Sequence, residues 1–159
     1  MSNKEIHLLE QQLKEDVFFS IQQIQDLEKK LNPEKSLDDR FALASACIKT
    51  KNELYIHKGI EHFLIILKKD SDEQIEKDCL YLISIGYFHL GDFVESRKWI
   101  NHLLKKYPDN NQAKVLNKLL ESKVTNDGMI GLLAVGGVAT AAITVAALGV
   151  GLGFLLMKK

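Results

Sequence analysis

Apolar residues recur at steps of three and four along most of the first 124 residues, with polar residues between them. This spacing places the apolar side chains on one face of an α-helix. Turn and cap signals divide residues 36–124 into helices over 39–50, 54–69, 73–90 and 93–107, with a last helix that ends near Val124. Because the strictly alternating pattern of β-strands does not appear, the sequence predicts an all-α fold.

The first 35 residues carry a helical stripe of their own, which Asn32-Pro33 ends because the residue before a proline is disfavoured in helices. Two arrangements fit this stripe. It forms either one helix, or an arm followed by a second helix that Asp16 caps and Val17 begins. In either case we expect residues 1–35 to be an arm and capping helix for a domain over 36–124.

The strongest apolar signal lies at the other end of the chain, from Met129 to Met157. These 29 residues contain no charged side chain, and as a helix they would be roughly 43 Å long. A bilayer core of about 30 Å needs about 20 such residues. The sequence therefore predicts a short hinge at 125–128 and a transmembrane tail anchor at 129–157, whereas a buried core helix would rarely be this long without a polar face.

Glycines are concentrated in this predicted anchor, and four of them define its small-residue positions: Gly136, Gly137, Gly149 and Gly153. Small residues four apart allow close approach of two membrane helices. They therefore fit a homo-oligomer held through its anchors, or a mildly hydrophobic tail suited to organelle sorting.

Composition excludes several classes of function. The 21 basic and 21 acidic residues balance, and without a clustered basic surface we expect no nucleic-acid binding. The N-terminus lacks a signal peptide, so we expect a cytosolic domain in which Cys47 and Cys79 are buried free thiols. Catalytic motifs are missing, and His57 and His62 lack the i, i+4 spacing of helical metal pairs. We expect no enzyme activity, metal or cofactor.

A 34-residue repeat runs from Lys77 to Asn110 in the register of a tetratricopeptide unit. Ser84 and Ser96 are its small residues, Gly91 its turn and Pro108 its terminator. A weaker copy begins near Asp38, with Ser45 and Gly59 as the small residues.

In such repeats the first helix of each pair lines a concave groove that can hold a partner helix or an extended peptide. The predicted groove residues are Ala42, Ala46 and Lys49 in the first unit and Tyr81, Ile85, Phe88 and His89 in the second. Alternatively, the N-terminal segment of the protein itself covers some of them.

Five segments together resemble the mitochondrial fission 1 protein family: DRFALASACIK (39–49), KGI (58–60), CLYLISIGYFHLGDF (79–93), NNQAKVL (110–116) and VGGVA (135–139). The resemblance implies a six-helix bundle of two tetratricopeptide-like units and a tail anchor. It also implies an adaptor that recruits dynamin-type fission GTPases, directly or through an adaptor protein.

The expected location is the mitochondrial outer membrane, with a cytosolic N-terminus, and also peroxisomes. Relatives often carry a basic residue in place of His89, and their C-terminal basic tail is longer than Lys158-Lys159. An alternative function is a tail-anchored tetratricopeptide receptor or co-chaperone, but its carboxylate clamp would need Lys and Asn where Ala42 and Ala46 stand.

Overall fold

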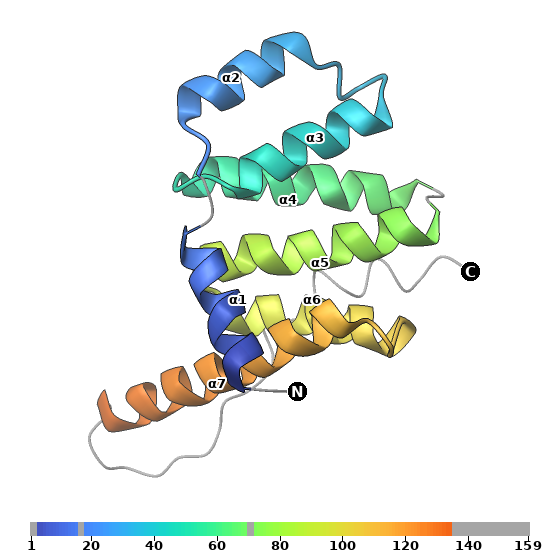
Figure 1. Cartoon of the computed structure of the whole chain (residues 1–159). Helices are drawn as coiled ribbons and strands as arrows, with labels where there is room; N and C mark the ends of the chain where they lie inside the picture. The colour runs from blue at the N-terminus through green and yellow to red at the C-terminus, as the bar shows by residue number, and fades with distance from the viewer. Residues whose placement is uncertain (1–2, 16–17, 70–71, 135–159) are drawn as a thin grey trace. The chain divides into compact units, whose positions relative to one another are not determined.

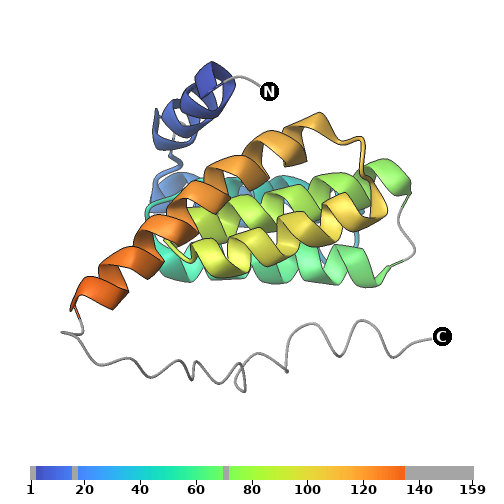
Figure 2. The same cartoon turned by 90° about the horizontal axis from the view of Figure 1, so that it is seen from below.

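The computed structural model describes residues 3–15, 18–69 and 72–134, and side chains as far as 125. This part of the chain is all-helical (Figures 1 and 2). The helices are α1 (Asn3–Glu15), α2 (Ile21–Lys30), α3 (Leu37–Ile48), α4 (Glu53–Lys68), α5 (Glu73–His89), α6 (Phe93–Lys106) and α7 (Asn111–Ala134). The chain divides into a first compact unit, 1–127, and a second, 128–159.

The resemblance implied a bundle of six helices, whereas the described part of the chain has seven. The difference arises because the N-terminal stripe forms two helices. Ser20 has an extended backbone and caps α2, and Gln23 completes a capping box with it. The preceding Phe19 donates its N–H to the carbonyl of Lys49 at 2.6 Å, which ties this linker to the end of α3. The second helix therefore begins at Ile21, and the predicted start at Val17 is wrong.

Polar side chains cap the starts of the later helices. Ser36 accepts a hydrogen bond from the backbone N–H of Asp39 at 3.1 Å. Asn110 accepts a hydrogen bond from the backbone N–H of Ala113 at 2.9 Å and caps α7 in the same way. Such bonds satisfy N–H groups that have no partner in the first helical turn, so the boundaries are set locally.

The predicted small residues let the paired helices approach closely. Gly59 of α4 lies against α3, where an added Cβ would be 2.8 Å from the carbonyl oxygen of Ala44. In the second pair, Ser84 of α5 and Ser96 of α6 are fully buried and donate to each other's carbonyls, at 2.8 and 2.7 Å. Gly91 makes the α5–α6 turn with φ +76°, a conformation that costs glycine little.

Most of the buried apolar side chains form one core beneath α3–α7, which includes Phe63, Ile83 and Leu116. The N-terminal helix α1 adds Leu13 to this core. Ile24 of α2 is buried in a second, smaller cluster on α3. Helix α2 therefore caps the α3 end of the repeat array. Helix α7, whose Leu116 and Leu120 are buried in the main core, lies next to α6 and caps the other end (Figure 1).

Helix α7 continues through residues 125–128, where the sequence predicted a hinge. These residues lack a proline, and Thr125 donates its hydroxyl to the carbonyl of Glu121 at 2.8 Å, a bond compatible with a helix. A single glycine costs a helix only about 1 kcal/mol. In the described residues we find no helix with the length and hydrophobicity needed to cross a bilayer. Residues 135–157 of the predicted anchor lie outside them.

Candidate partner-binding groove

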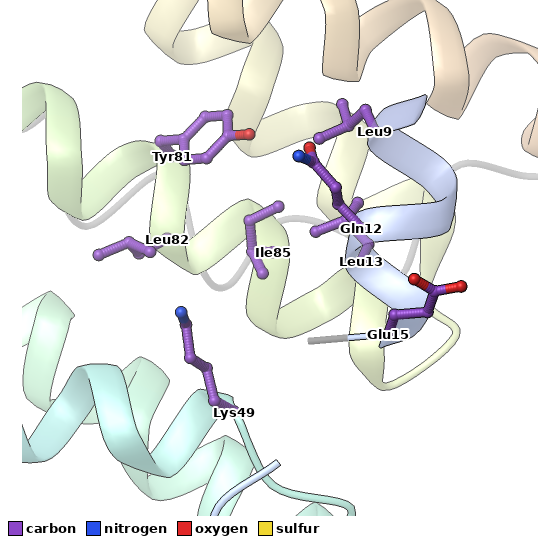
Figure 3. Close-up of a pocket in the computed structure, with 8 residues that line it drawn as sticks. All are labelled: Leu9, Gln12, Leu13, Glu15, Lys49, Tyr81, Leu82 and Ile85. Carbon is purple, nitrogen blue, oxygen red and sulfur yellow. The ribbon is translucent and has the colours of Figure 1, made fainter. Parts of the chain in front are cut away.

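Three of the predicted groove residues line one cavity of about 420 Å³ within residues 1–127: Lys49, Tyr81 and Ile85. Lys49 follows the last turn of α3, while Tyr81 and Ile85 are four residues apart on α5 and share one helix face. Figure 3 shows the two α5 side chains on one side of the space and Lys49 reaching toward it from α3.

The opposite wall of this cavity comes from α1, through Leu9, Gln12, Leu13 and Glu15. In Figure 3, Leu9, Gln12 and Leu13 lie across from Tyr81 and Ile85. A second cavity of about 310 Å³ lies along α1 as well, and Tyr81, Leu9 and Gln12 line both. The N-terminal segment therefore covers part of the predicted groove and leaves open space on two sides of Tyr81.

The other four predicted residues do not line these two cavities. Ala42 is exposed on α3, and Ala46 is buried. Phe88 packs against Phe93 with ring centroids 5.4 Å apart. His89 bonds to the carbonyl of Ile48 through Nδ1 at 2.8 Å, so its ring is fixed to the end of α3. The last turn of α5 thus serves packing between helices.

The contribution of α1 to the groove was only partly visible in the sequence. Leu9 and Leu13 belong to the N-terminal apolar stripe, which predicted burial but not the surface that α1 would cover. Leu13 is buried in the main core, and Lys123 of α7 bonds Glu10 at 2.6 Å. This ion pair joins α1 to a helix 113 residues later in the chain, a contact that local spacing cannot predict.

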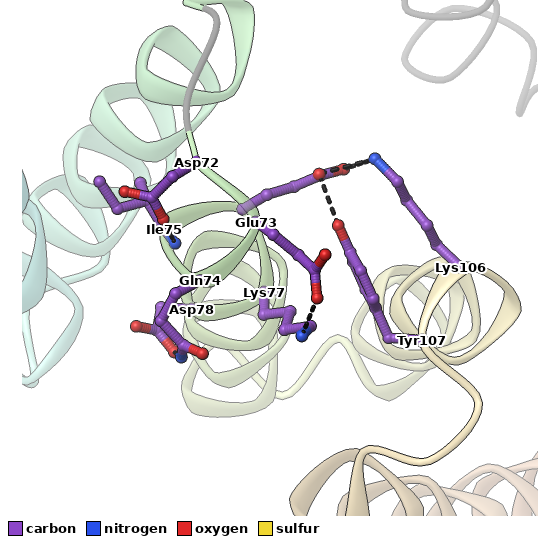
Figure 4. A network of polar contacts seen from close by, with 9 residues as sticks. Asp72, Glu73, Gln74, Ile75, Lys77, Asp78, Lys106 and Tyr107 are labelled. Atoms are coloured by element: carbon purple, nitrogen blue, oxygen red, sulfur yellow. Dashed lines mark hydrogen bonds and ion pairs between the residues drawn. The ribbon is translucent and has the colours of Figure 1, made fainter.

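A third cavity, of about 560 Å³, lies at the opposite end of the helices and is lined mainly by polar residues. Glu76 accepts hydrogen bonds there from Lys106 and from the hydroxyl of Tyr107, at 2.6 and 2.8 Å (Figure 4). Partial burial opposes ionisation of Glu76, but these two bonds outweigh it and lower its pKa. Lys77, above the Tyr107 ring, bonds Glu73. Because its lysines are paired, we assign this network to the joining of α5 and α6.

The two cysteines are free and buried, as predicted. Burial raises the pKa of Cys47 to about 11 and that of Cys79 to about 12. At neutral pH both are therefore protonated, and a thiol is a much weaker nucleophile than a thiolate. The cavity between α1 and α5 combines an apolar surface with the polar side chains of Gln12, Glu15 and Lys49, which suits binding of a peptide or helix.

Comparisons with known proteins agree with this fold. Residues 77–129 match a family model described as the Fis1 C-terminal tetratricopeptide repeat, which begins where the predicted 34-residue repeat begins. The crystal structure of fission protein Fis1 from Saccharomyces cerevisiae has a TM-score of 0.63 at 23% identity, over 76% of this chain and 95% of that one. Yeast Fis1 in complex with an Mdv1 fragment has a TM-score of 0.62 at 24% identity, over 73% and 94%.

The sequence relatives extend the similarity beyond the fold. A human mitochondrial fission 1 protein is 31% identical over 125 residues, which cover 76% of this chain and 82% of the relative. A relative of the same name from Debaryomyces hansenii is 36% identical over 121 residues, with coverage of 76% and 73%. At this identity and coverage, the chain belongs to the mitochondrial fission 1 protein family.

Proposed function

We propose that this protein is a membrane-anchored adaptor in mitochondrial fission, which offers its tetratricopeptide-like groove to a component of the division machinery. Membership of the mitochondrial fission 1 protein family carries this proposal, since the human relative aligns over 82% of its length. The groove supplies a physical means of binding, because Tyr81 and Ile85 form an apolar surface beside open space.

The proposed partner is a dynamin-type fission GTPase or an adaptor protein that carries it. Yeast Fis1 has been crystallised with an Mdv1 fragment that contains N-terminal extension and coiled-coil domains. An amphipathic helix of such a partner would match an apolar wall with Lys49 at its edge. We retain Ala42, Ala46, Phe88 and His89 as proposed groove residues, of which the buried Ala46 would act by shaping the surface.

We also propose that residues 129–157 anchor the protein in the mitochondrial outer membrane, and in the peroxisomal membrane, with residues 36–124 in the cytosol. The uncharged 29-residue run supports this proposal. A fluorescent protein fused to the N-terminus should label these organelles, and removal of residues 128–159 should release it to the cytosol. An unchanged distribution after the truncation would contradict the anchor. Pairing of anchors would make a homo-oligomer, which crosslinking in membranes would detect.

A pair of tyrosine substitutions tests the groove. In cells that lack the endogenous protein, Tyr81→Ala should reduce recovery of the fission GTPase or its adaptor and leave mitochondria elongated. Tyr55→Ala is the matched control, because Tyr55 is also partly buried but packs against the α2–α3 cluster. If cells with Tyr81→Ala divide mitochondria as well as cells with Tyr55→Ala, the groove is not the binding site.

A further inference from the structure

Three helices carry an exposed large apolar side chain in their first turn. Ile21 is the first residue of α2, and Leu54 and Val94 are the second residues of α4 and α6. Their exposed fractions are 43%, 80% and 51%. Because Cα–Cβ bonds in a helix tilt toward its N-terminus, side chains of the first turn extend past the helix end. We call the surface formed by Ile21, Leu54 and Val94 the apolar end.

Contacts between helix termini show that these three starts share one end of the first unit. The N–H of Phe19, before α2, bonds the carbonyl of Lys49, after α3. His89, the last residue of α5, bonds the carbonyl of Ile48, the last of α3. Since α4 follows α3 and α6 follows α5 after short turns, α2, α4 and α6 begin together, as Figure 1 also shows.

A row of aromatic side chains crosses the same end. Phe18 meets the ring of His89 edge-on at 5.6 Å, Phe88 follows at 6.3 Å from His89, and Phe93 lies 5.4 Å from Phe88. Lys51 lies over the Phe18 ring at 5.4 Å. These rings pack against one another at this end, and Lys51 is the exposed member of the group. A lysine at a membrane surface can bury its stem and keep its charge in water.

The opposite end of the unit is different. Helices α3, α5 and α7 begin there, and their first turns expose or half-expose polar side chains: Asp38, Asp39, Glu73, Gln74, Asn111 and Gln112. The apolar end also has acidic groups, but these serve its helix starts. Asp92 accepts the N–H of Glu95 at 3.0 Å, and Glu53 lies in the first turn of α4. The apolar end would therefore bind a partner through the burial of apolar side chains and not through net positive charge.

The course of α7 indicates which surface the apolar end would contact. Arg97, in the second turn of α6, bonds Glu121 of α7 at 3.3 Å. Helix α7 has therefore returned to the level of the α6 start by Glu121, and the first unit ends six residues later at Asp127. The uncharged run 129–157 follows directly.

We propose that the apolar end rests on the lipid surface into which the tail of the same chain inserts, with Ile21, Leu54 and Val94 among the lipid headgroups. This inference depends on the proposed tail anchor. Tethering keeps the domain at a high effective concentration beside the bilayer, so three exposed apolar side chains suffice for contact. The contact would fix the orientation in which Tyr81 and Ile85 meet a partner.

Methyl NMR of the full chain in phosphatidylcholine nanodiscs tests the inference, with a nitroxide on the lipid headgroups. The methyl signals of Leu54 and Val94 should be lost, while that of Ile65 remains. Ile65 is a matched control, since it is exposed, lies on the same helix and face as Leu54, and is 11 residues further along, about 16 Å. Equal signals for Leu54 and Ile65 would overturn the lipid contact.

Two further observations separate the possible failures. If the full chain does not co-migrate with the nanodiscs, the tail anchor and the inference fail together. Co-migration without loss of the Leu54 signal overturns the inference alone. Shifts of Leu54 that grow with protein concentration and need no nitroxide would instead assign this end to a second copy of the chain. The exposed double substitution Leu54→Ser/Val94→Ser should restore the Ile21 signal, whereas Ile65→Ser should not.

Discussion

Arg40 is a charged side chain inside the fold, and its contact with His62 makes the stability of the domain depend on pH. Its Nη1 donates to Nδ1 of His62 at 3.0 Å, and its Nη2 pairs with Glu34 at 3.1 Å. Burial, and then the charge of Arg40, lower the pKa of His62. The folded protein therefore holds a neutral imidazole as the acceptor, because a protonated ring would lose the bond and face a cation.

Stability should therefore decrease below neutral pH. The pKa of His62 is lower in the folded than in the unfolded state, so the unfolded chain binds more protons as the pH falls from about 6.5. We expect the free energy of unfolding, measured with urea, to fall between pH 7.5 and 5. In His62→Asn, whose amide oxygen can replace Nδ1 as acceptor, this decrease should be smaller. His57→Asn, an exposed position on the same helix, should keep the wild-type slope.

Substitution of the buried serine pair in the second repeat should reduce stability through a lost hydrogen bond and through packing. Ser96→Ala removes the bond to the carbonyl of Ser84 but keeps the small volume that the α5–α6 crossing requires. We expect a loss of about 1 kcal/mol, the usual value for a buried hydrogen bond. Ser96→Val should cost more, because it loses the same bond and also places a larger, branched side chain in a fully buried site. Equal denaturation midpoints for the two variants would contradict a tight crossing.

At the scale of the helices, Gly59 and Gly91 are required for different structural reasons. At Gly59 the constraint is space, since a Cβ would meet the Ala44 carbonyl oxygen and Ile48 Cγ2 at 2.8 Å each. At Gly91 a Cβ would meet nothing within 4 Å, and the constraint is the positive φ. The first glycine sets the distance between α3 and α4, and the second reverses the chain between α5 and α6.

These two constraints predict opposite orders of substitution. Gly59→Ala should cost about 1–3 kcal/mol through overpacking, and Gly59→Asn should cost more because it is larger. Gly91→Ala should cost about 1–2 kcal/mol through its backbone, and Gly91→Asn less, because asparagine tolerates the left-handed region. Thermal or urea unfolding of the four variants measures both orders. If the same residue, alanine or asparagine, were the less destabilising one at both positions, the assignment of a space constraint to Gly59 and a backbone constraint to Gly91 would be contradicted.

At the scale of the whole molecule, the ion pair between Glu10 and Lys123 holds α1 over the proposed groove. Hydrogen bonds from Lys123 and then Lys14 lower the pKa of Glu10 to about 2. This lowered pKa means that the ion pair stabilises α1 above pH 4.5 and is lost as the pH falls from there toward 2. Because the groove walls include Leu9 and Leu13, release of α1 would expose Tyr81 and Ile85 together.

Glu10→Gln should therefore loosen α1 at pH 7. A partly exposed ion pair is worth at most about 1 kcal/mol, so hydrogen exchange of the α1 amides should rise by no more than about fivefold. Glu15→Gln is the control, because it removes a charge from the same helix while an amide oxygen can still accept from Gln11. Faster exchange in Glu15→Gln than in Glu10→Gln would show that the pair with Lys123 does not hold α1.

Local signals were sufficient to predict the helices and the repeat. The spacing of apolar residues, the polar caps and Gly91 act within a few residues of one another, and Gly59, Ser84 and Ser96 mark helix crossings because only small side chains allow them. The N-terminal stripe left open whether it forms one helix or two, although Ser20 and Gln23 have the local spacing of a capping box. What local spacing could not predict is the bond from Phe19 to Lys49, 30 residues further along, which ties the linker before α2 to the end of α3.

What the sequence alone determined about this protein is its helical repeat architecture, its family and the uncharged run at its end, because periodicity and motif order are properties of the chain itself. Tertiary structure decided which predicted groove residues face open space. Lys49, Tyr81 and Ile85 meet α1 across a cavity, whereas His89 bonds the end of α3. It also brought Ile21, Leu54 and Val94 to one end of the molecule, since only packing fixes where separate helices begin relative to one another.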